Sequence, residues 1–234
     1  KAMITENHLG IGHPETAAIY REVGQTYWRT AEYVLGRGIS IEPNLIIATG
    51  SPSQNPSTRS ISIKGLISGG RDALTKVAES VVMDEDRSPH EKAEAVAQLG
   101  DWNLAFGKKQ TASESYRSAY DILMESFETP EVADHYFKDP VPVRFMDDLM
   151  RPMPSDGVDD AVSHLNISMT ITEGGRPLNV KVLNPPEEAP GDGIRKLKRM
   201  ISEMRFRPRL SDGDPVKSEA FLWQLPLNET EFAP

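Results

Sequence analysis

The feature that most constrains this fold is a change in the spacing of apolar residues across a cluster of prolines. Before the cluster, apolar side chains recur every three or four residues, as on one face of an α-helix. After it, polar residues alternate with Leu165, Ile167, Met169 and Ile171, a pattern typical of a half-buried β-strand. The prolines between the two patterns are Pro140, Pro142, Pro152 and Pro154. We therefore expect a helical domain at 1–139, a linker at 140–157 and an α+β domain at 158–234.

The helical half shows the signals of paired helices. Apolar stripes are formed by Tyr20, Val23, Gly24 and Tyr27, and later by Ala73, Leu74, Val77, Val81 and Val82. Capping boxes at 88–91 and 111–114 predict the starts of two more helices, the first ending near Phe106. A last short helix is expected from 129 to 138. Short turns between these helices predict antiparallel helical hairpins.

The segment from 40 to 70 interrupts the helical pattern. It is rich in Ser and Thr and contains Pro43, Gly50, Pro52, Asn55 and Pro56. A loop of this length inside a compact domain is usually functional or mobile. We interpret it as an insertion or a flexible loop within the helical domain.

The C-terminal half predicts two strands, a helix and a further strand. The strands are expected at 165–171 and 178–182, joined by a Gly-Gly turn, and the helix at 194–204. A last strand is expected at 218–225. One helix across a small antiparallel sheet is an α+β unit, so the fold class of the whole chain is α plus α+β, with a ββαβ C-terminal domain.

Composition excludes several classes of function. The net charge of −9 would repel a phosphate backbone, so we expect no nucleic-acid partner. The longest aliphatic run is 45–48, which is too short to span a bilayer. The absence of cysteine removes disulfides, thiolate zinc sites and cysteine nucleophiles. Since Lys1 is followed by no apolar signal segment, we interpret the chain as a mature form or a fragment.

The helical half resembles a tetratricopeptide-repeat array. The spacing of one repeat is found in Leu99-Gly100-Asp101-Trp102 followed by Ala112, Tyr116 and Ala119, and the stripe around Val23-Gly24 is similar to the first helix of an earlier repeat. The likeness covers residues 1–127 and departs from the family at Asn103, where an aromatic residue is usual. The resemblance implies a peptide-binding groove with candidate contacts at Arg21, Gln25, Trp28, Arg29 and Asp101.

The C-terminal half resembles the C-terminal domain of the TonB family of energy transducers. The likeness is carried by the hairpin with Glu173-Gly174-Gly175-Arg176-Pro177 at its turn, and by Arg205-Phe206-Arg207-Pro208 followed by Asp212-Gly213-Asp214-Pro215-Val216. It covers residues 158–227. The resemblance implies a periplasmic protein of a Gram-negative cell envelope with a link to TonB-type transport.

Two departures limit what this second resemblance implies. The family's Tyr-Pro element, which helps to engage the TonB box of a receptor, has no nearer counterpart than Val141-Pro142-Val143. The chain also contains neither the inner-membrane anchor nor the long proline-rich spacer of a transducer. We therefore expect a soluble periplasmic module, or one anchored by a segment outside this chain, and not a complete transducer.

No enzymatic motif is complete in this sequence. The segment 90–94 lacks the second histidine of a zincin helix, and capping explains its residues. The segment 107–109 fails the P-loop pattern, and 10–12 lacks the third glycine of a dinucleotide site. The possible ligands within 131–135 are three without a fourth, a weak metal site. We therefore predict a non-enzymatic protein with no metal and no cofactor.

Basic side chains cluster around the expected C-terminal helix and the strand after it, although the chain as a whole is acidic. They are Arg195, Lys196, Lys198, Arg199, Arg205, Arg207 and Arg209. The cluster is either a solvated outer face or a docking surface for an acidic partner, a glycan phosphate or an anionic headgroup.

These observations favour a binding or adaptor protein with a protein or peptide partner in the cell envelope. A terminal strand at 218–225 would leave one row of backbone groups unpaired, to which an extended peptide could add. Its candidate contacts are Phe221, Leu222, Trp223 and Gln224. The alternatives are a structural role, in which a homodimer forms through the same edge, and a hydrolase with its site in 40–70 or upstream of Lys1, for which no nucleophile–base pair is found.

Overall fold

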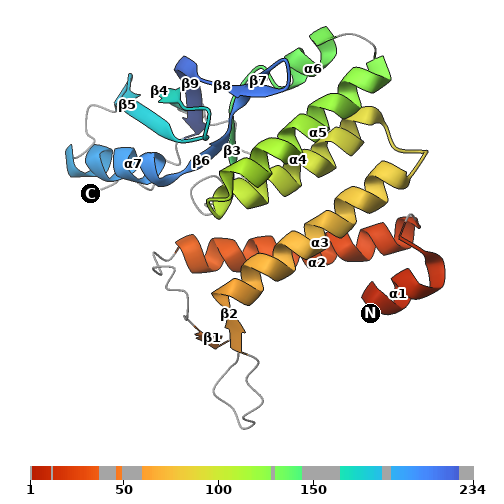
Figure 1. The fold of residues 1–234 in the computed structure, drawn as a ribbon. Coiled ribbons are helices and arrows are strands. Elements are labelled where there is room, and N and C mark those ends of the chain that lie inside the picture. The colour runs from red at the N-terminus through yellow and green to blue at the C-terminus, as the bar shows by residue number, and fades with distance from the viewer. Residues whose placement is uncertain are drawn as a thin grey trace, which may run out of the picture. The chain divides into compact units, whose positions relative to one another are not determined.

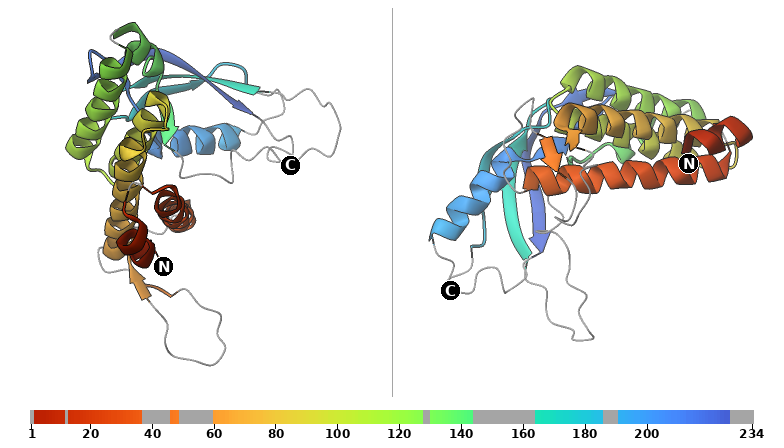
Figure 2. Two further views of the ribbon diagram at one scale, coloured as in Figure 1. Left: turned by 90° about the vertical axis from the view of Figure 1, so that its right-hand side faces the viewer. Right: turned by 90° about the horizontal axis from the view of Figure 1, so that it is seen from below.

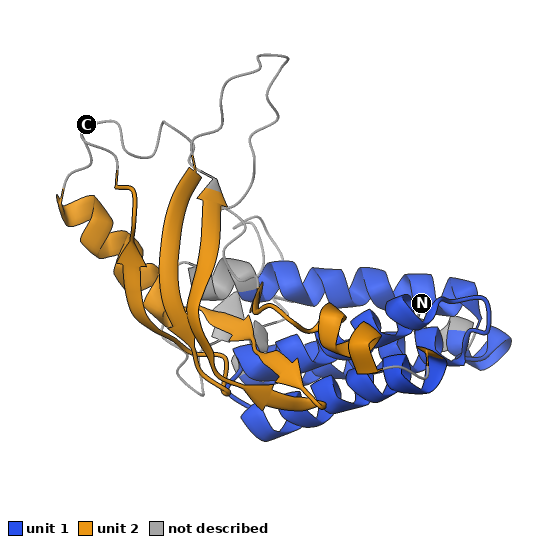
Figure 3. Cartoon of the chain, turned by 90° about the horizontal axis from the view of Figure 1, so that it is seen from above, with its two compact units in different colours: residues 1–126 blue, residues 127–234 orange. Residues whose placement is uncertain are grey.

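The chain divides into two units, residues 1–126 and 127–234 (Figure 3). The structure is a computed structural model, and it describes residues 2–11, 13–36, 46–48, 60–127, 130–143, 164–185 and 191–226. Packed helix pairs form the first unit, and the second contains small antiparallel sheets with one long helix (Figure 1). The predicted fold class is confirmed at this level.

The first unit consists of five helices and a small β-hairpin in its described part. The helices are α1 (Ala2–Leu9), α2 (Pro14–Gly36), α3 (Ile63–Met83), α4 (Pro89–Ala105) and α5 (Lys109–Phe127). β1 (Ile46–Ala48) and β2 (Ser60–Ser62) pair antiparallel ahead of α3. Ser80, near the end of α3, donates a hydrogen bond to the carbonyl of Ile11, just before α2. α2 and α3 are therefore antiparallel, and α1 lies beside α2 (Figure 2).

Trp102 of α4 is a buried core residue of this unit. Its side chain is fully buried, and its Nε1 donates a hydrogen bond of 3.0 Å to the carbonyl of Ile67 on α3. A Cβ atom at Gly70 would lie 2.1 Å from Cζ2 of Trp102. Because no side chain fits there, a glycine lets α3 approach the indole ring closely.

α3 begins at Ile63, inside the segment expected to be an insertion. The helical pattern of its first turns is hidden because Gly65, Gly69 and Gly70 are poor helix formers and contribute no apolar side chain. Gly69 and Gly70 instead leave room for the side chains of Tyr27 and Trp102, respectively, which pack directly against them. The remainder of 40–70, apart from β1 and β2, lies outside the described residues.

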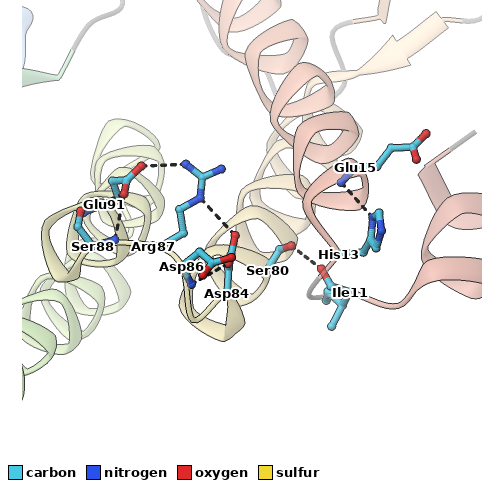
Figure 4. Close-up of polar contacts among 9 residues, drawn as sticks. All are labelled: Ile11, His13, Glu15, Ser80, Asp84, Asp86, Arg87, Ser88 and Glu91. Carbon is cyan, nitrogen blue, oxygen red and sulfur yellow. Dashed lines mark hydrogen bonds and ion pairs between the residues drawn. The ribbon is translucent and has the colours of Figure 1, made fainter.

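The predicted capping box at 88–91 is confirmed at the start of α4. The Glu91 N–H donates to Ser88 Oγ (3.3 Å), and the Ser88 N–H donates to Glu91 Oε2 (3.0 Å). Arg87 lies between Asp84 and Glu91, with N–O distances of 3.3 and 2.8 Å (Figure 4). The second predicted box, at 111–114, is wrong: α5 already begins at Lys109, because the Lys108 carbonyl accepts the Ala112 N–H at 3.0 Å.

The second unit contains two helices and seven strands in its described part. They are α6 (Pro130–Tyr136), β3 (Val141–Val143), β4 (His164–Ile171), β5 (Pro177–Val182), α7 (Gly191–Glu203), β6 (Arg205–Arg207), β7 (Arg209–Ser211), β8 (Asp214–Val216) and β9 (Ser218–Pro226). β5, β4 and β9 form an antiparallel sheet in that order, while β3 pairs with β6 and β7 with β8. The predicted hairpin, helix and last strand correspond to β4–β5, α7 and β9.

One face of the three-stranded sheet forms the core of this unit. The core consists of Leu165, Ile167, Met169, Ile171, Leu197, Ile201, Phe206 and Leu225. The β4 members are the alternating apolar residues of the sequence, and α7 contributes Leu197 and Ile201. The helix thus covers the apolar face, and the other face of β4 carries half-buried polar side chains.

The division into units falls before α6, whereas the predicted domain boundary falls after it. The Leu210 N–H donates to the Phe137 carbonyl at 3.1 Å, and β3 pairs along β6. Residues 130–143 are thereby bonded to C-terminal strands that are distant in sequence. The part of the predicted linker after residue 143 lies outside the described residues.

A Gly70→Ala substitution tests the close packing around Trp102. We expect it to lower the free energy of unfolding by about 2–3 kcal/mol, because the added methyl group displaces a fully buried indole ring. Gly24→Ala on α2 is the control, since its Cβ would lie 3.2 Å from a flexible Leu74 methyl group. We expect that variant to stay within about 1 kcal/mol of wild type. Urea unfolding of both variants makes the comparison, and equal stabilities would contradict the packing argument.

The capping box predicts an acid-sensitive contribution to stability. The hydrogen bond from the Ser88 backbone and the neighbouring Arg87 guanidinium lower the pKa of Glu91 from 4.5 to about 2. A lowered folded-state pKa means that the contribution is complete above pH 4.5 and is lost as the pH falls to about 2. Glu91→Gln keeps an acceptor for the Ser88 N–H but does not titrate. We expect its unfolding free energy to change less than that of wild type between these pH values, and an unchanged pH profile would disprove the assignment.

Candidate functional site

Alternate residues of β9 point their backbone N–H and carbonyl groups away from β4, the strand beside it. Asn166 of β4 points its backbone toward β5, because its N–H donates to Asn184 Oδ1 at 2.5 Å and its carbonyl accepts the Leu183 N–H at 2.8 Å. The neighbouring residue Ile167 therefore points toward β9, where Trp223 is its partner. It follows that the N–H and carbonyl groups of Leu222 and Gln224 point away from β4.

No other strand pairs with β9 in the part of the chain that the structure describes. Within the described residues, the outward-pointing backbone groups of Leu222 and Gln224 therefore form an open sheet edge. We call these two residues the β9 edge. Strand edges of this kind can pair with an extended segment of another chain.

The side chains of β9 divide between the two faces of the sheet as expected from their alternation. Phe221 and Trp223 pack inward against Phe206, with ring centroids 6.3 and 5.7 Å apart. Leu222 is 64% exposed on the other face, and the exposed Gln224 lies opposite Asn166. The four predicted contact residues therefore have different roles: two hold the strand in place and two face outward.

A β-bulge precedes the β9 edge. Between the pairs Met169–Phe221 and Ile171–Ser218, two residues of β9 oppose one residue of β4. One of the two, Ala220, has a φ of 51°, in the left-handed region that disfavours L-residues with a side chain. The bulge interrupts the regular edge on the side of Ser218.

The predicted groove residues of the helical unit do not form one exposed set. Arg21, Gln25 and Arg29 are exposed on α2 at a spacing of four residues, which places them along one ridge of the helix. Trp28 is half-buried and meets Trp102 edge-on, with ring centroids 5.1 Å apart. Asp101 is 8% exposed and accepts a hydrogen bond of 2.9 Å from the Tyr116 hydroxyl.

The seven predicted basic residues are dispersed over different environments. Arg195, Lys196 and Arg199 are exposed on α7, and Arg195 forms an ion pair with Asp192. Lys198 is half-buried on the same helix, and Arg209 is exposed on β7. Arg205 is half-buried at the end of α7, whereas Arg207 is only 5% exposed. A single docking surface of all seven is therefore not present.

Two kinds of feature are absent from the described ranges. No three His, Asp or Glu side chains there are gathered as they would be around a metal ion. None of the helices in these ranges combines the length and the apolarity that a membrane crossing requires.

Comparison with known proteins assigns no family to the chain. No family model matches the sequence, and neither a curated protein nor a solved structure does. The tetratricopeptide and TonB resemblances therefore stay predictions that depend on the residues quoted for them.

The bulge predicts a stabilising substitution next to the β9 edge. Ala220→Gly should raise the free energy of unfolding by about 0.5–1 kcal/mol, because glycine adopts a positive φ without a steric cost. The neighbouring Glu219 has no positive φ, so Glu219→Gly should instead lower stability. Thermal unfolding of the two variants checks the sign of each change, and destabilisation by Ala220→Gly would contradict the bulge geometry.

Proposed function

We propose that this chain is a non-enzymatic binding protein that captures an extended peptide segment of a partner by adding it to the β9 edge. The observation that carries the proposal is the direction of the Leu222 and Gln224 backbone groups, which point away from β4. A peptide strand paired there would extend the β5-β4-β9 sheet by one strand.

The side chains of the β9 edge suit such a role. A bound strand would place alternate side chains beside the exposed Leu222 and Gln224, on the polar face of the sheet, and the others toward the apolar core face. The backbone pairing would supply affinity without regard to sequence. Contacts with Leu222 and Gln224 would supply preference for particular side chains.

The helical unit contributes a second surface in this proposal. Arg21, Gln25 and Arg29 form an exposed ridge with two positive charges on α2, and the tetratricopeptide resemblance implies a peptide groove on this helix. Two peptide surfaces on one chain are the arrangement of an adaptor. The TonB resemblance supports a periplasmic location for this adaptor and a link to TonB-type envelope transport, as parts of the same proposal.

Self-association is the second candidate function, and the exposure of Leu222 favours it. Two copies could pair their β9 edges antiparallel about a twofold axis, which would bring both Leu222 side chains near the same interface. Peptide capture and dimerisation use the same edge, so they exclude each other unless a peptide displaces the second copy.

The test of strand addition compares two proline variants on opposite edges of the sheet. Leu222→Pro removes an outward N–H from β9 without removing a bond to β4. Val182→Pro is the matched change on β5. The Leu183 N–H bonds to β4, so the N–H of the preceding Val182 points away from β4 and its loss removes no bond within the sheet. Peptides selected from a random library against the wild-type chain serve as probes, and calorimetry measures their affinities.

We expect Leu222→Pro to weaken the selected peptides about tenfold or more, since a backbone hydrogen bond is lost and the ring blocks the edge. Val182→Pro should bind them like wild type. Equal affinities for all three proteins would remove strand addition from consideration. Sedimentation of the wild-type chain and of Leu222→Pro distinguishes self-association from peptide capture. A wild-type dimer that dissociates in Leu222→Pro would indicate self-association.

A further inference from the structure

Arg205 is held at the C-terminal end of α7. Its Nη1 donates to the carbonyl oxygens of Glu203 (3.2 Å) and Met204 (2.9 Å). The last carbonyls of a helix carry partial negative charge and lack partners within the helix, so a guanidinium group is well placed there. Within the described residues, the other guanidinium N–H groups of this half-buried side chain make no hydrogen bond.

The turn between β4 and β5 brings a second arginine to the same place. The Phe206 N–H donates to the Gly175 carbonyl at 2.9 Å, which joins the turn to the residue after Arg205. Arg176 follows Gly175, and its own backbone is fixed by two bonds with Thr172, each 3.0 Å long. The guanidinium group of Arg176 is exposed at the end of this rigid turn.

These two positive charges have no acidic partner within the described ranges. Among the described residues no carboxylate forms an ion pair with either side chain. Burial and then the charge of Arg176 lower the pKa of the Arg205 guanidinium. In contrast, Arg195 and Lys217 have Asp192 and Glu219 beside them. A partly desolvated charge usually has a partner of opposite sign, and among the described residues the half-buried Arg205 has none.

We propose that Arg176 and Arg205 form a binding site for an oxyanion group, a carboxylate or a phosphate held between two guanidinium forks. Guanidinium groups bind both kinds of anion through paired N–H donors. The Arg205 side chain is held by its bonds to two backbone carbonyls, and the backbone of Arg176 is fixed in the turn from which its side chain extends. The site lies at the β4–β5 turn and the end of α7. It does not depend on the β9 edge, which is on the opposite side of β4, and so it goes beyond the proposed function.

Thermal unfolding of the full chain tests this site with sodium phosphate, sodium acetate and sodium chloride at equal ionic strength. We expect phosphate or acetate to raise the melting temperature above its value in chloride. Because phosphate also stabilises folded proteins by exclusion from their surface, a rise with phosphate alone identifies a phosphate ligand only where Arg176→Gln loses it, and a rise with acetate alone that Arg176→Gln loses identifies a carboxylate. The absence of any rise above chloride overturns the proposal.

Arg176→Gln separates binding from fold. It should bind the effective anion about tenfold more weakly or worse, because charge-assisted hydrogen bonds are lost. In chloride it should be at least as stable as wild type, because repulsion with Arg205 is removed. Arg199→Gln, an exposed change on α7, should keep the full response to the anion. An equal response of wild type and Arg176→Gln overturns the proposal even if Arg205 variants fail to fold.

Discussion

The second unit depends on the pairing of β4 with a strand on each side. Odd-numbered residues of β4 point their side chains into the core, and Ile167 points its backbone toward β9, while Asn166 points its backbone toward β5. A slip of one residue would exchange the two faces and expose the apolar set. The register that buries the core therefore also decides which backbone groups of β9 are left facing outward, so the fold and the candidate site have one cause.

Local periodicity was sufficient to predict β4, β5, α7 and β9, because each is long enough to show its own pattern. The pairs β3–β6 and β7–β8 were not predicted, since strands of three residues show no period and β3 joins a partner distant in sequence. The same limit explains Arg176. Its proximity to Arg205 depends on the bond between Phe206 and Gly175, and no spacing in the sequence reveals that bond.

In the helical unit the sequence indicated helices more reliably than the orientation of individual side chains. Trp28 and Asp101 were expected to face a groove, but Trp28 packs on Trp102 and Asp101 accepts the Tyr116 hydroxyl. A buried aromatic residue, or an acidic residue whose carboxylate is hydrogen-bonded inside the fold, can occupy the same helical spacing as an exposed one. Spacing alone therefore does not show which way such a side chain points. The start of α3 was hidden for a related reason, because glycines there serve close packing that appears only when the partner helix is in place.

The bulge before the β9 edge limits how strongly backbone pairing alone could hold a partner. In the described part of β9 past Ala220, Leu222 and Gln224 offer both an outward N–H and an outward carbonyl, which amounts to four hydrogen bonds, and Pro226 has no N–H to add. At about 0.5–1.5 kcal/mol each, they yield roughly 2–6 kcal/mol, and the loss of translational and rotational freedom on association costs roughly 4–15 kcal/mol. A ladder this short implies rapid exchange of any segment bound there, with residence time set by whatever else the same partner touches.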